Sequence, residues 1–288
     1  MIRLDRHGRD WLHSEASLDP VVHSIFEHVI NVDTKRGTLI TIQKQGLPMQ
    51  PATIQPGERD FDAIMDACKN PSKQIDLRCL KRREAHEVSL AIPALRPPEN
   101  TADQIAFLRA WLKAHGTRGG LYAVLFPERV PSPTLMERKL ASVWAVSEEA
   151  YRFGGLTGLG VGLTPSGDDA LHGLTAVMQA FLGKQAAGRV TGDSRHRLRM
   201  TTDVSRTMLT HAFSGETNES ILTLLKTLSK GHWLETEEAF REVNRIGSTS
   251  GTDTLIGVLK GLQLLQAEQI RRNRHNGKTG DHPKECIL

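Results

Sequence analysis

The sequence predicts an α+β fold in which a mixed or β-rich N-terminal domain precedes a mostly α-helical domain. Residues 19–130 contain short apolar segments, some alternating with period two and separated by Gly and Pro, as in strands and turns. Residues 131–268 instead repeat apolar side chains at helical spacing over successive segments. Between these regions, PERVPSP at 127–133 contains three prolines, which are typical of a linker.

The start of the chain is expected to contain an extension, a strand hairpin and a proline-containing segment. Residues 1–18 are expected to precede the first domain as an extension. Strands are predicted at 21–32, which is rich in β-branched residues, and at 37–46, which alternates with period two. The intervening DTKRG ends in glycine and favours a hairpin. Residues 47–56 include three prolines and are predicted to be a loop or an edge strand.

The remainder of the first domain is expected to mix helices with strands. Helices are predicted at 60–68 and at 101–116, where apolar side chains share one face and a glycine ends the pattern. Strands are predicted at 86–95 and 119–126, two short apolar segments bounded by turn residues.

The second domain is expected to consist of helices joined by short connections. Apolar residues recur at intervals of three and four in six segments. These segments are 134–153, 170–182, 202–213, 218–229, 235–246 and 253–267. The last residues, 269–288, are expected to form a flexible basic tail.

Composition excludes several functional classes. The net charge is +4 over 288 residues, and the basic stretches 184–200 and 271–288 are not interleaved with aromatic residues, so we expect no nucleic-acid partner. Three cysteines without a CxxC pair argue against a zinc site or disulfide framework and fit a reducing compartment. The N-terminus lacks a secretory apolar region, and no apolar run reaches about 18 residues. We therefore expect a cytoplasmic protein without a membrane partner.

The most unusual stretch is GGLTGLGVGLTPSGDDALHGL at 154–174. It carries five glycines ahead of a Pro-Ser-Gly-Asp-Asp corner and an apolar helical segment, more than a turn requires. Glycine allows backbone to approach a ligand closely, and a helix start presents free amide groups, so the segment predicts a binding site. The stretch has no Gly-Lys-[Ser/Thr], which excludes a P-loop.

The corner SGDDALHGL at 166–174 is repeated as SGTDTLIGV at 250–258. One interpretation is a capping box in each copy, in which the Ser oxygen accepts a hydrogen bond from the third helical amide. Capping does not explain Gly173 and Gly257, because a glycine inside a helix costs about 1 kcal/mol relative to Ala. We therefore predict that the two helices cross near these glycines and that their N-termini converge on one pocket.

Three uses of the paired aspartates remain open. A divalent ion such as Mg²⁺ could bridge them to a phosphate, with Asp168 as the candidate metal ligand. The carboxylates could instead hold an amide or amine group while backbone amides hold an anionic end. Alternatively, one aspartate is a general base whose pKa is raised by its neighbour. We expect Asp168 to face the ligand and Asp169 to support the helix end.

The stretch GLGVGLTPSGDDALHGL resembles the signature of a bacterial family long described as a domain of unknown function, which includes the AllH-type subunit of oxamate carbamoyltransferase. VHSIFEHVINV and GSTSGTDTLIGVLKGL are similar to the other blocks of that family. Through the resemblance, and with two polar residues at another predicted helix start, we obtain a set of candidate pocket residues. These are His23, Ser24, Asn31, Gly158, Gly160, Gly162, Thr164, Ser166, Gly167, Asp168, Asp169, Ser214, Asn218, Ser250, Gly251 and Asp253.

The resemblance implies a transferase subunit acting on carbamoyl phosphate and an oxamate-like small carboxylate, within anaerobic allantoin degradation and hence purine catabolism. It implies other subunits of a carbamoyltransferase complex as partners. It assigns no catalytic residues, so Asp168 and Asp169 are candidates for that role. The alternative hypothesis is a non-catalytic module that binds a small anion or assists assembly while a partner subunit performs the reaction.

Overall fold

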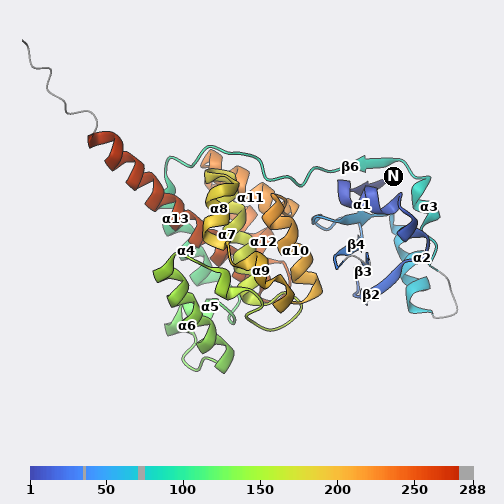
Figure 1. Ribbon diagram of the computed structural model, residues 1–288, viewed down its shortest axis with the longest axis horizontal. Helices are drawn as coiled ribbons and strands as arrows, with labels where there is room; N and C mark the ends of the chain where they lie inside the picture. Colours follow the sequence, from blue (N-terminus) through green and yellow to red (C-terminus); the bar gives the residue numbers. More distant parts are fainter. Residues whose placement is uncertain (35–36, 71–74, 279–288) are drawn as a thin grey trace, which may run out of the picture.

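The computed structural model describes residues 1–34, 37–70 and 75–278, and its N-terminal part is built on a six-stranded mixed sheet (Figure 1). The strands are β1 (Ile2–Leu4), β2 (Val21–Ile25), β3 (Val29–Asp33), β4 (Leu39–Gln43), β5 (Thr53–Gln55) and β6 (Ala85–Glu87). Their order is β2-β3-β4-β5-β1-β6, with parallel pairing for β4–β5 and β1–β6 and antiparallel pairing elsewhere.

The predicted hairpin is confirmed in the pairing of β3 with β4, where Val32 lies opposite Ile40. Its turn includes residues 35–36, which lie outside the described part of the chain. The segment 21–32 forms two strands rather than one, because the chain turns back after β2 and β3 pairs with β2 antiparallel. Residues 47–56, predicted as a loop or an edge strand, supply β5, which lies inside the sheet between β4 and β1.

Residues 1–18, expected as an extension, are part of this sheet region. They form β1, helix α1 (Arg6–Leu12) and the 3₁₀ helix η1 (Glu15–Leu18). The buried carboxylate of Asp5 caps α1 by accepting from the amide of Gly8 at 2.9 Å, and it also accepts from the amides of Ala52 and Thr53. A further helix, α2 (Glu58–Lys69), packs Phe61 into the apolar core of the sheet, and α3 (Arg78–Lys81) follows.

The helical region begins earlier than the expected boundary at residue 131. After β6 the chain runs as an extended connection to the helices (Figure 1). The helices are α4 (Thr101–His115), α5 (Tyr122–Leu125), α6 (Leu135–Ala150), α7 (Ser166–Leu182), α8 (Lys184–Thr191), α9 (Ser194–Arg197), α10 (Asp203–Ser214), α11 (Glu219–Lys230), α12 (Trp233–Asn244) and α13 (Ser250–Lys278). Short 3₁₀ helices occur at Pro127–Arg129 (η2), Gly154–Leu156 (η3) and Leu198–Met200 (η4). Side chains of α4 and α5 belong to the same buried core as those of α7 and α13.

Of two further predicted strands, one is shorter than expected and the other is wrong. The strand expected at 86–95 is limited to β6, and the one expected at 119–126 is helix α5. In the second case the amides of Leu125 and Phe126 donate to the carbonyls four residues earlier. Leu121, Tyr122 and Phe126 are buried together, and a short apolar run with no exposed face cannot be assigned to helix or strand by periodicity.

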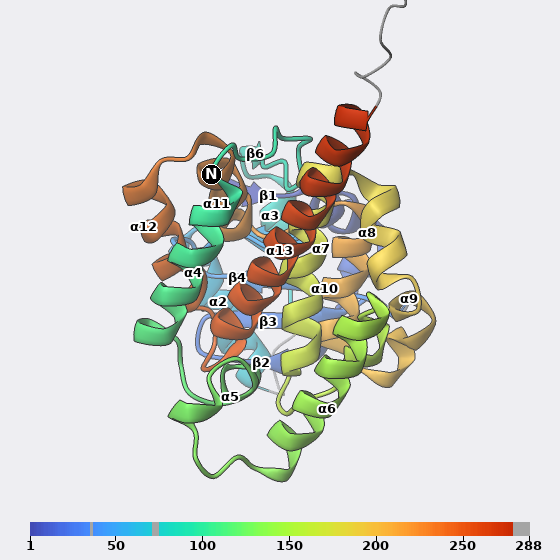
Figure 2. The ribbon, with the colours of Figure 1, turned by 90° about the vertical axis from the view of Figure 1, so that its left-hand side faces the viewer.

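Helices α7 and α13 pack side by side at the centre of the helical region, with the other helices around them (Figure 2). The predicted crossing near the two interior glycines is confirmed. A Cβ atom added to Gly173 would lie 2.1 Å from the carbonyl oxygen of Thr254, and one added to Gly257 would lie 2.0 Å from that of Ala170. The contact is reciprocal between the two sequence copies, and it brings the N-termini of both helices together.

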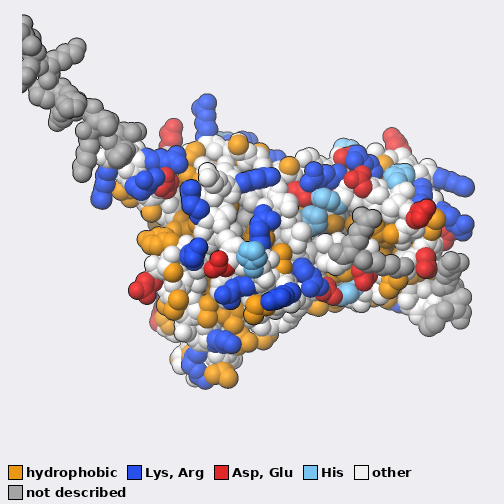
Figure 3. Space-filling view, viewed as in Figure 1, with side chains coloured by type: hydrophobic (Ala, Val, Ile, Leu, Met, Phe, Trp, Pro, Cys, Tyr) orange, Lys and Arg blue, Asp and Glu red, His pale blue; other side chains and the backbone are white. Residues whose placement is uncertain are grey.

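Charged side chains are spread over the surface. On the face drawn in Figure 3, Lys and Arg side chains are distributed over both the helical and the sheet region. The basic stretch 184–200 is folded into α8, α9 and η4. Among the described residues, no helix combines the length and the apolar character that a membrane span requires.

Candidate functional site

A cavity of about 840 Å³ lies between the sheet region and the helical region. The sheet side contributes Asn31, Leu39 and Thr41 from β3 and β4. The helical side contributes the loop of residues 157–165, which precedes α7, and the N-termini of α7 and α13. Its polar groups from these helical elements include Thr164, Ser166, Asp169, His172, Ser250 and Thr254.

Asp169 is the carboxylate that the first turn of α7 presents to this cavity. The side chain is buried, and its Oδ2 atom has no hydrogen-bond partner among the described residues. The hydroxyls of Ser250 and Thr164 hydrogen-bond with each other at 2.7 Å, and as polar neighbours both favour the ionised form of Asp169. Burial, followed by the nearby charge of Asp253, nevertheless raises the pKa of Asp169 well above its ordinary value.

Asp253 lies behind Asp169 and does not line the cavity. Its Oδ1 accepts a hydrogen bond from the amide of Leu121 at 2.8 Å. Gly120 covers the carboxylate so closely that an added Cβ would lie 2.7 Å from Oδ2. Burial raises the pKa of Asp253 to about 7, against the opposing effect of hydrogen bonds from Leu121, Ser166 and Thr249.

Each aspartate therefore has the serine of the other sequence copy as a polar neighbour. Ser166 of the first copy favours the ionised form of Asp253 in the second, and Ser250 of the second favours that of Asp169 in the first. The capping-box interpretation is wrong for Ser166, because it is the first residue of α7 and the N-cap is Pro165, which offers no side-chain cap. The serine hydroxyl is free to reach across to the other helix instead.

Asp168 holds the loop of residues 157–165 in place. Its Oδ1 accepts from the amide of Gly158 at 2.8 Å, and its Oδ2 accepts from the hydroxyl of Thr201. The side chain is fully buried and does not line the cavity. Burial raises its pKa, while the hydrogen bonds oppose the rise. Compared with the sequence-based expectation, the two aspartates are placed the other way round: Asp169 faces the cavity, and Asp168 hydrogen-bonds with the loop before α7.

Most glycines of the loop serve close packing of backbone on backbone. A Cβ on Gly158 would lie 2.4 Å from the carbonyl oxygen of Met200, and one on Gly160 would lie 2.3 Å from the amide of Ser166. Both have positive φ angles. Gly167 and Gly251 likewise press against carbonyl groups of the segments before their helices. Gly160 and Gly162 both line the cavity, but only Gly162 of the two has open space where a Cβ would lie.

The candidates from the first strands form a polar chain that only partly reaches the cavity. Asn31 lines it and donates to the Ser24 hydroxyl at 3.0 Å. Ser24 in turn lies 3.1 Å from Nδ1 of His23, whose Nε2 lies 3.2 Å from a carboxylate oxygen of Asp203. His23 and Ser24 are outside the described lining and connect β2 to α10.

Of the two candidate residues near α11, one lines the cavity and the other does not. Asn218 lines the cavity and caps α11 by accepting from the amide of Ile221 at 2.8 Å. Ser214 does not line it, and its hydroxyl donates to the carbonyl of Thr210 within α10.

Sequence reasoning missed two features of the site. His172 follows Asp169 along α7 and lines the cavity, where burial lowers its pKa to about 4 and therefore favours the neutral ring. Its Nε2 lies 2.8 Å from the hydroxyl of Thr217. Gly119 and Gly120 also form part of the wall, and both have positive φ angles. The glycine pair was a usable signal, because positive φ favours glycine.

The cavity has an acidic character. Asp169 and Glu137 are among its described lining residues, and none of those residues is Lys or Arg. A phosphate group placed beside an ionised Asp169 would experience repulsion of about 4 kcal/mol at an effective dielectric near 20. The described wall therefore suits a neutral hydrogen-bond donor, such as an amide NH₂ group, better than an anion.

Two family models match the chain, one on each side of the cavity. Residues 2–91 match the AllH family N-terminal domain, and residues 156–262 match the oxamate carbamoyltransferase subunit AllH. The first match contains the whole sheet, and the second contains α7 and the start of α13. No solved structure matches the chain. The resemblance found in the sequence is thereby confirmed.

Proposed function

The chain belongs to the AllH family, and from this premise we propose that it is a subunit of an oxamate carbamoyltransferase-type enzyme that binds a carbamoyl-bearing or amide-bearing small substrate at Asp169. One observation supports this assignment above the others. The carboxylate of Asp169 is buried at the cavity wall with one oxygen unpaired among the described residues. An unpaired buried acceptor is costly, and a bound N–H donor removes that cost.

Both expected substrates carry such a donor. Carbamoyl phosphate and oxamate each have an NH₂ group on a carbonyl carbon, which can donate to Oδ2 of Asp169. Gly162 and Gly247 line the same cavity, and their backbone amides can donate to the carbonyl oxygen. This arrangement agrees with the second use of the aspartates, in which a carboxylate holds an amide.

The position of Asp169 at the cavity wall also fits the third use, that of a general base. In carbamoyl transfer, the oxamate nitrogen forms a bond to the carbamoyl carbon, and the bond from that carbon to the phosphate oxygen breaks. The nitrogen loses one proton, and phosphate leaves with the bonding electrons. Asp169 is the lining carboxylate placed to take that proton, and we assign it this role.

The anionic ends of the substrates need positive charge that the described lining does not provide. A divalent ion such as Mg²⁺ or a basic side chain of another subunit could supply it. Asp168 is poorly suited to hold the ion, because both of its oxygens already accept hydrogen bonds within the protein. We therefore place the charge for the phosphate with a partner subunit or with a substrate-bound cation.

The test compares Asp169→Asn with Asp10→Asn, an exposed carboxylate on α1, in the assembled complex with its partner subunits. We expect Asp169→Asn to lower kcat for carbamoyl transfer by about 100-fold or more, in the range for loss of a general base, while the complex still assembles. Asp10→Asn should retain the wild-type rate. Wild-type turnover in the assembled Asp169→Asn complex would refute the catalytic assignment.

The acidic wall favours a second candidate function, in which this chain only binds a small ligand while a partner performs the reaction. In that case Asp169→Asn raises KM or weakens assembly but leaves kcat at saturating substrate unchanged. Measuring kcat and KM separately, with assembly followed by light scattering, therefore distinguishes the two functions.

A further inference from the structure

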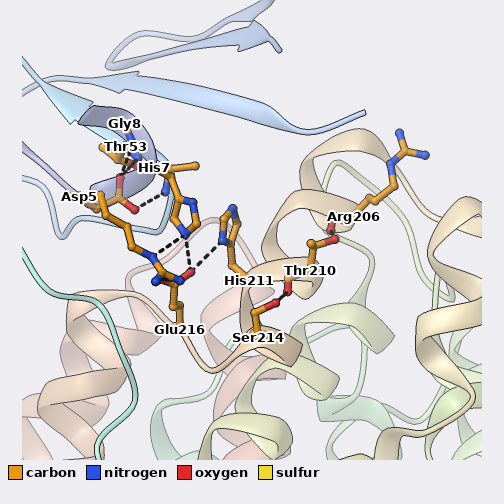
Figure 4. A network of polar contacts seen from close by, with 12 residues as sticks. Asp5, His7, Gly8, Thr53, Arg206, Thr210, His211, Ser214 and Glu216 are labelled. Carbon is orange, nitrogen blue, oxygen red and sulfur yellow. Dashed lines mark hydrogen bonds and ion pairs between the residues drawn. The ribbon is translucent and has the colours of Figure 1, made fainter. Parts of the chain in front are cut away.

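Two histidines and a glutamate meet between the sheet region and the helical region, away from the cavity lining. His7 comes from α1, His211 from the last turn of α10, and Glu216 from the connection between α10 and α11. Figure 4 shows both imidazole rings turned toward the carboxylate of Glu216. One nitrogen of each ring and one oxygen of the carboxylate lie within 4.8 Å of one another. None of the three residues is among the described lining of the cavity.

The cluster is tightly built. Oε2 of Glu216 lies 2.7 Å from Nε2 of His7 and 3.0 Å from Nδ1 of His211. The two rings stack edge to face with centroids 4.5 Å apart. Glu216 and His211 are buried, and His7 is half-buried. Three side chains that share one acceptor atom in this way already have most of the convergence that a metal ion requires.

Glu216 supplies the acidic donor of the cluster. Its Oε2 atom faces one nitrogen of each imidazole ring, so a cation held by the two rings would also meet a carboxylate oxygen. Its other oxygen, Oε1, forms an ion pair with the guanidinium of Arg6 at 2.8 Å.

We propose that His7, His211 and Glu216 bind a divalent transition-metal ion of the zinc type, which fastens the sheet region to the helical region. Two imidazole nitrogens and one carboxylate oxygen are a donor set that suits Zn²⁺, with water completing a tetrahedral site. The ion replaces the protons now shared in the cluster, and the ligands need to open slightly from hydrogen-bonding distances. This inference is independent of the proposed carbamoyl transfer, because it involves no residue of the cavity wall.

The charge of Arg6 predicts in which direction an Arg6 substitution changes the metal affinity. Its Nε lies 3.2 Å from Nε2 of His7, so its positive charge opposes a cation bound to that nitrogen. The Arg6 side chain is 58% exposed, so solvent weakens the repulsion. Arg6→Ala should therefore bind the metal about two- to fivefold more tightly than wild type, whereas a site that depended on Arg6 would bind more weakly.

The experiment titrates Co²⁺ into the full-length protein after treatment with EDTA and follows the visible absorption bands of the bound ion. We expect one ion per chain, displaced by Zn²⁺. His211→Ala and Glu216→Gln should each weaken binding by at least about 100-fold. His13→Ala, an exposed histidine at the end of α1, should leave binding unchanged.

Circular dichroism of each variant tests whether it is folded. Glu216→Gln serves as the conservative variant, because it preserves the shape of the side chain. A folded wild-type protein that binds no Co²⁺ at millimolar concentration would overturn the proposal. So would binding that persists unchanged in both His211→Ala and Glu216→Gln, or binding that Arg6→Ala abolishes.

Discussion

Replacing Asp253 by Asn isolates the energetic effect of the buried carboxyl pair. Burial raises the pKa of Asp253 to about 7 in the folded protein, whereas an aspartate in the unfolded chain titrates near 3.9. Asn has the same shape, and its Oδ1 can still accept the hydrogen bond from the amide of Leu121. The substitution therefore removes the titration while preserving the packing and one hydrogen bond.

The direction of the pH dependence of stability follows from proton binding. Between about pH 4 and pH 7 the folded state holds a proton on Asp253 that the unfolded state has released, so wild-type stability falls as the pH rises through this window. Three pKa units at about 1.4 kcal/mol each give an upper limit of about 4 kcal/mol above pH 7. Asp253→Asn does not incur this loss. We expect it to be about 1 kcal/mol more stable than wild type at pH 4.5 and about 2–4 kcal/mol more stable at pH 8.5.

Urea unfolding at four pH values from 4.5 to 8.5 measures this difference. Asp169 also has a raised pKa, so a smaller pH dependence should remain in the variant. Asp10→Asn, an exposed control, should follow wild type at every pH. If the unfolding free energy of Asp253→Asn declines with pH as steeply as that of wild type, the folded protein does not hold a protonated Asp253.

Three further predictions concern the helix crossing, the loop before α7 and the end of α6. Gly173→Ala places a Cβ 2.1 Å from a carbonyl oxygen of α13 and should lower the free energy of unfolding in urea by about 1–3 kcal/mol. The control Gly188→Ala, whose Cβ would have nothing within 4 Å, should raise it by about 0.5–1 kcal/mol, and equal effects of the two substitutions would contradict the close crossing. Asp168→Ala leaves the Gly158 amide unpaired and should lower the free energy of unfolding by about 1–3 kcal/mol. An unchanged free energy of unfolding would show that other contacts hold the loop. Tyr151→Gly should stabilise by about 0.5–1 kcal/mol, because this exposed residue ends α6 with a φ of 52°; a lower melting temperature would refute that.

The sequence indicated the helix crossing because a glycine inside a helix weakens that helix unless close packing compensates. Gly173 and Gly257 lie inside apolar helical segments at equivalent positions of a repeat, so each marked a point of close approach. The sequence could not assign the roles of Asp168 and Asp169 in the same way. Adjacent helical residues point about 100° apart, and which one faces the cavity depends on the side from which the preceding loop approaches.

Local pattern also failed where no residue marked a turn. The segment 21–32 contains neither Gly nor Pro, so the reversal between β2 and β3 left no signal. The metal-binding proposal had no signal either, because His7 lies far along the chain from His211 and Glu216. Their convergence depends on how α1 is placed against α10, which is a property of tertiary packing alone.

The repeated corner produces an asymmetric pair of acids, and this asymmetry makes one of them suited to chemistry. Asp169 and Asp253 occupy equivalent positions, and each has the serine of the other copy as a polar neighbour. The difference comes from residues 119–121, which cover Asp253 with a glycine and a donated amide and leave Asp169 facing the cavity. Asp253 can then act only through its charge, by raising the pKa of Asp169. Two exposed carboxylates would both be solvated, and burial would raise the pKa of neither.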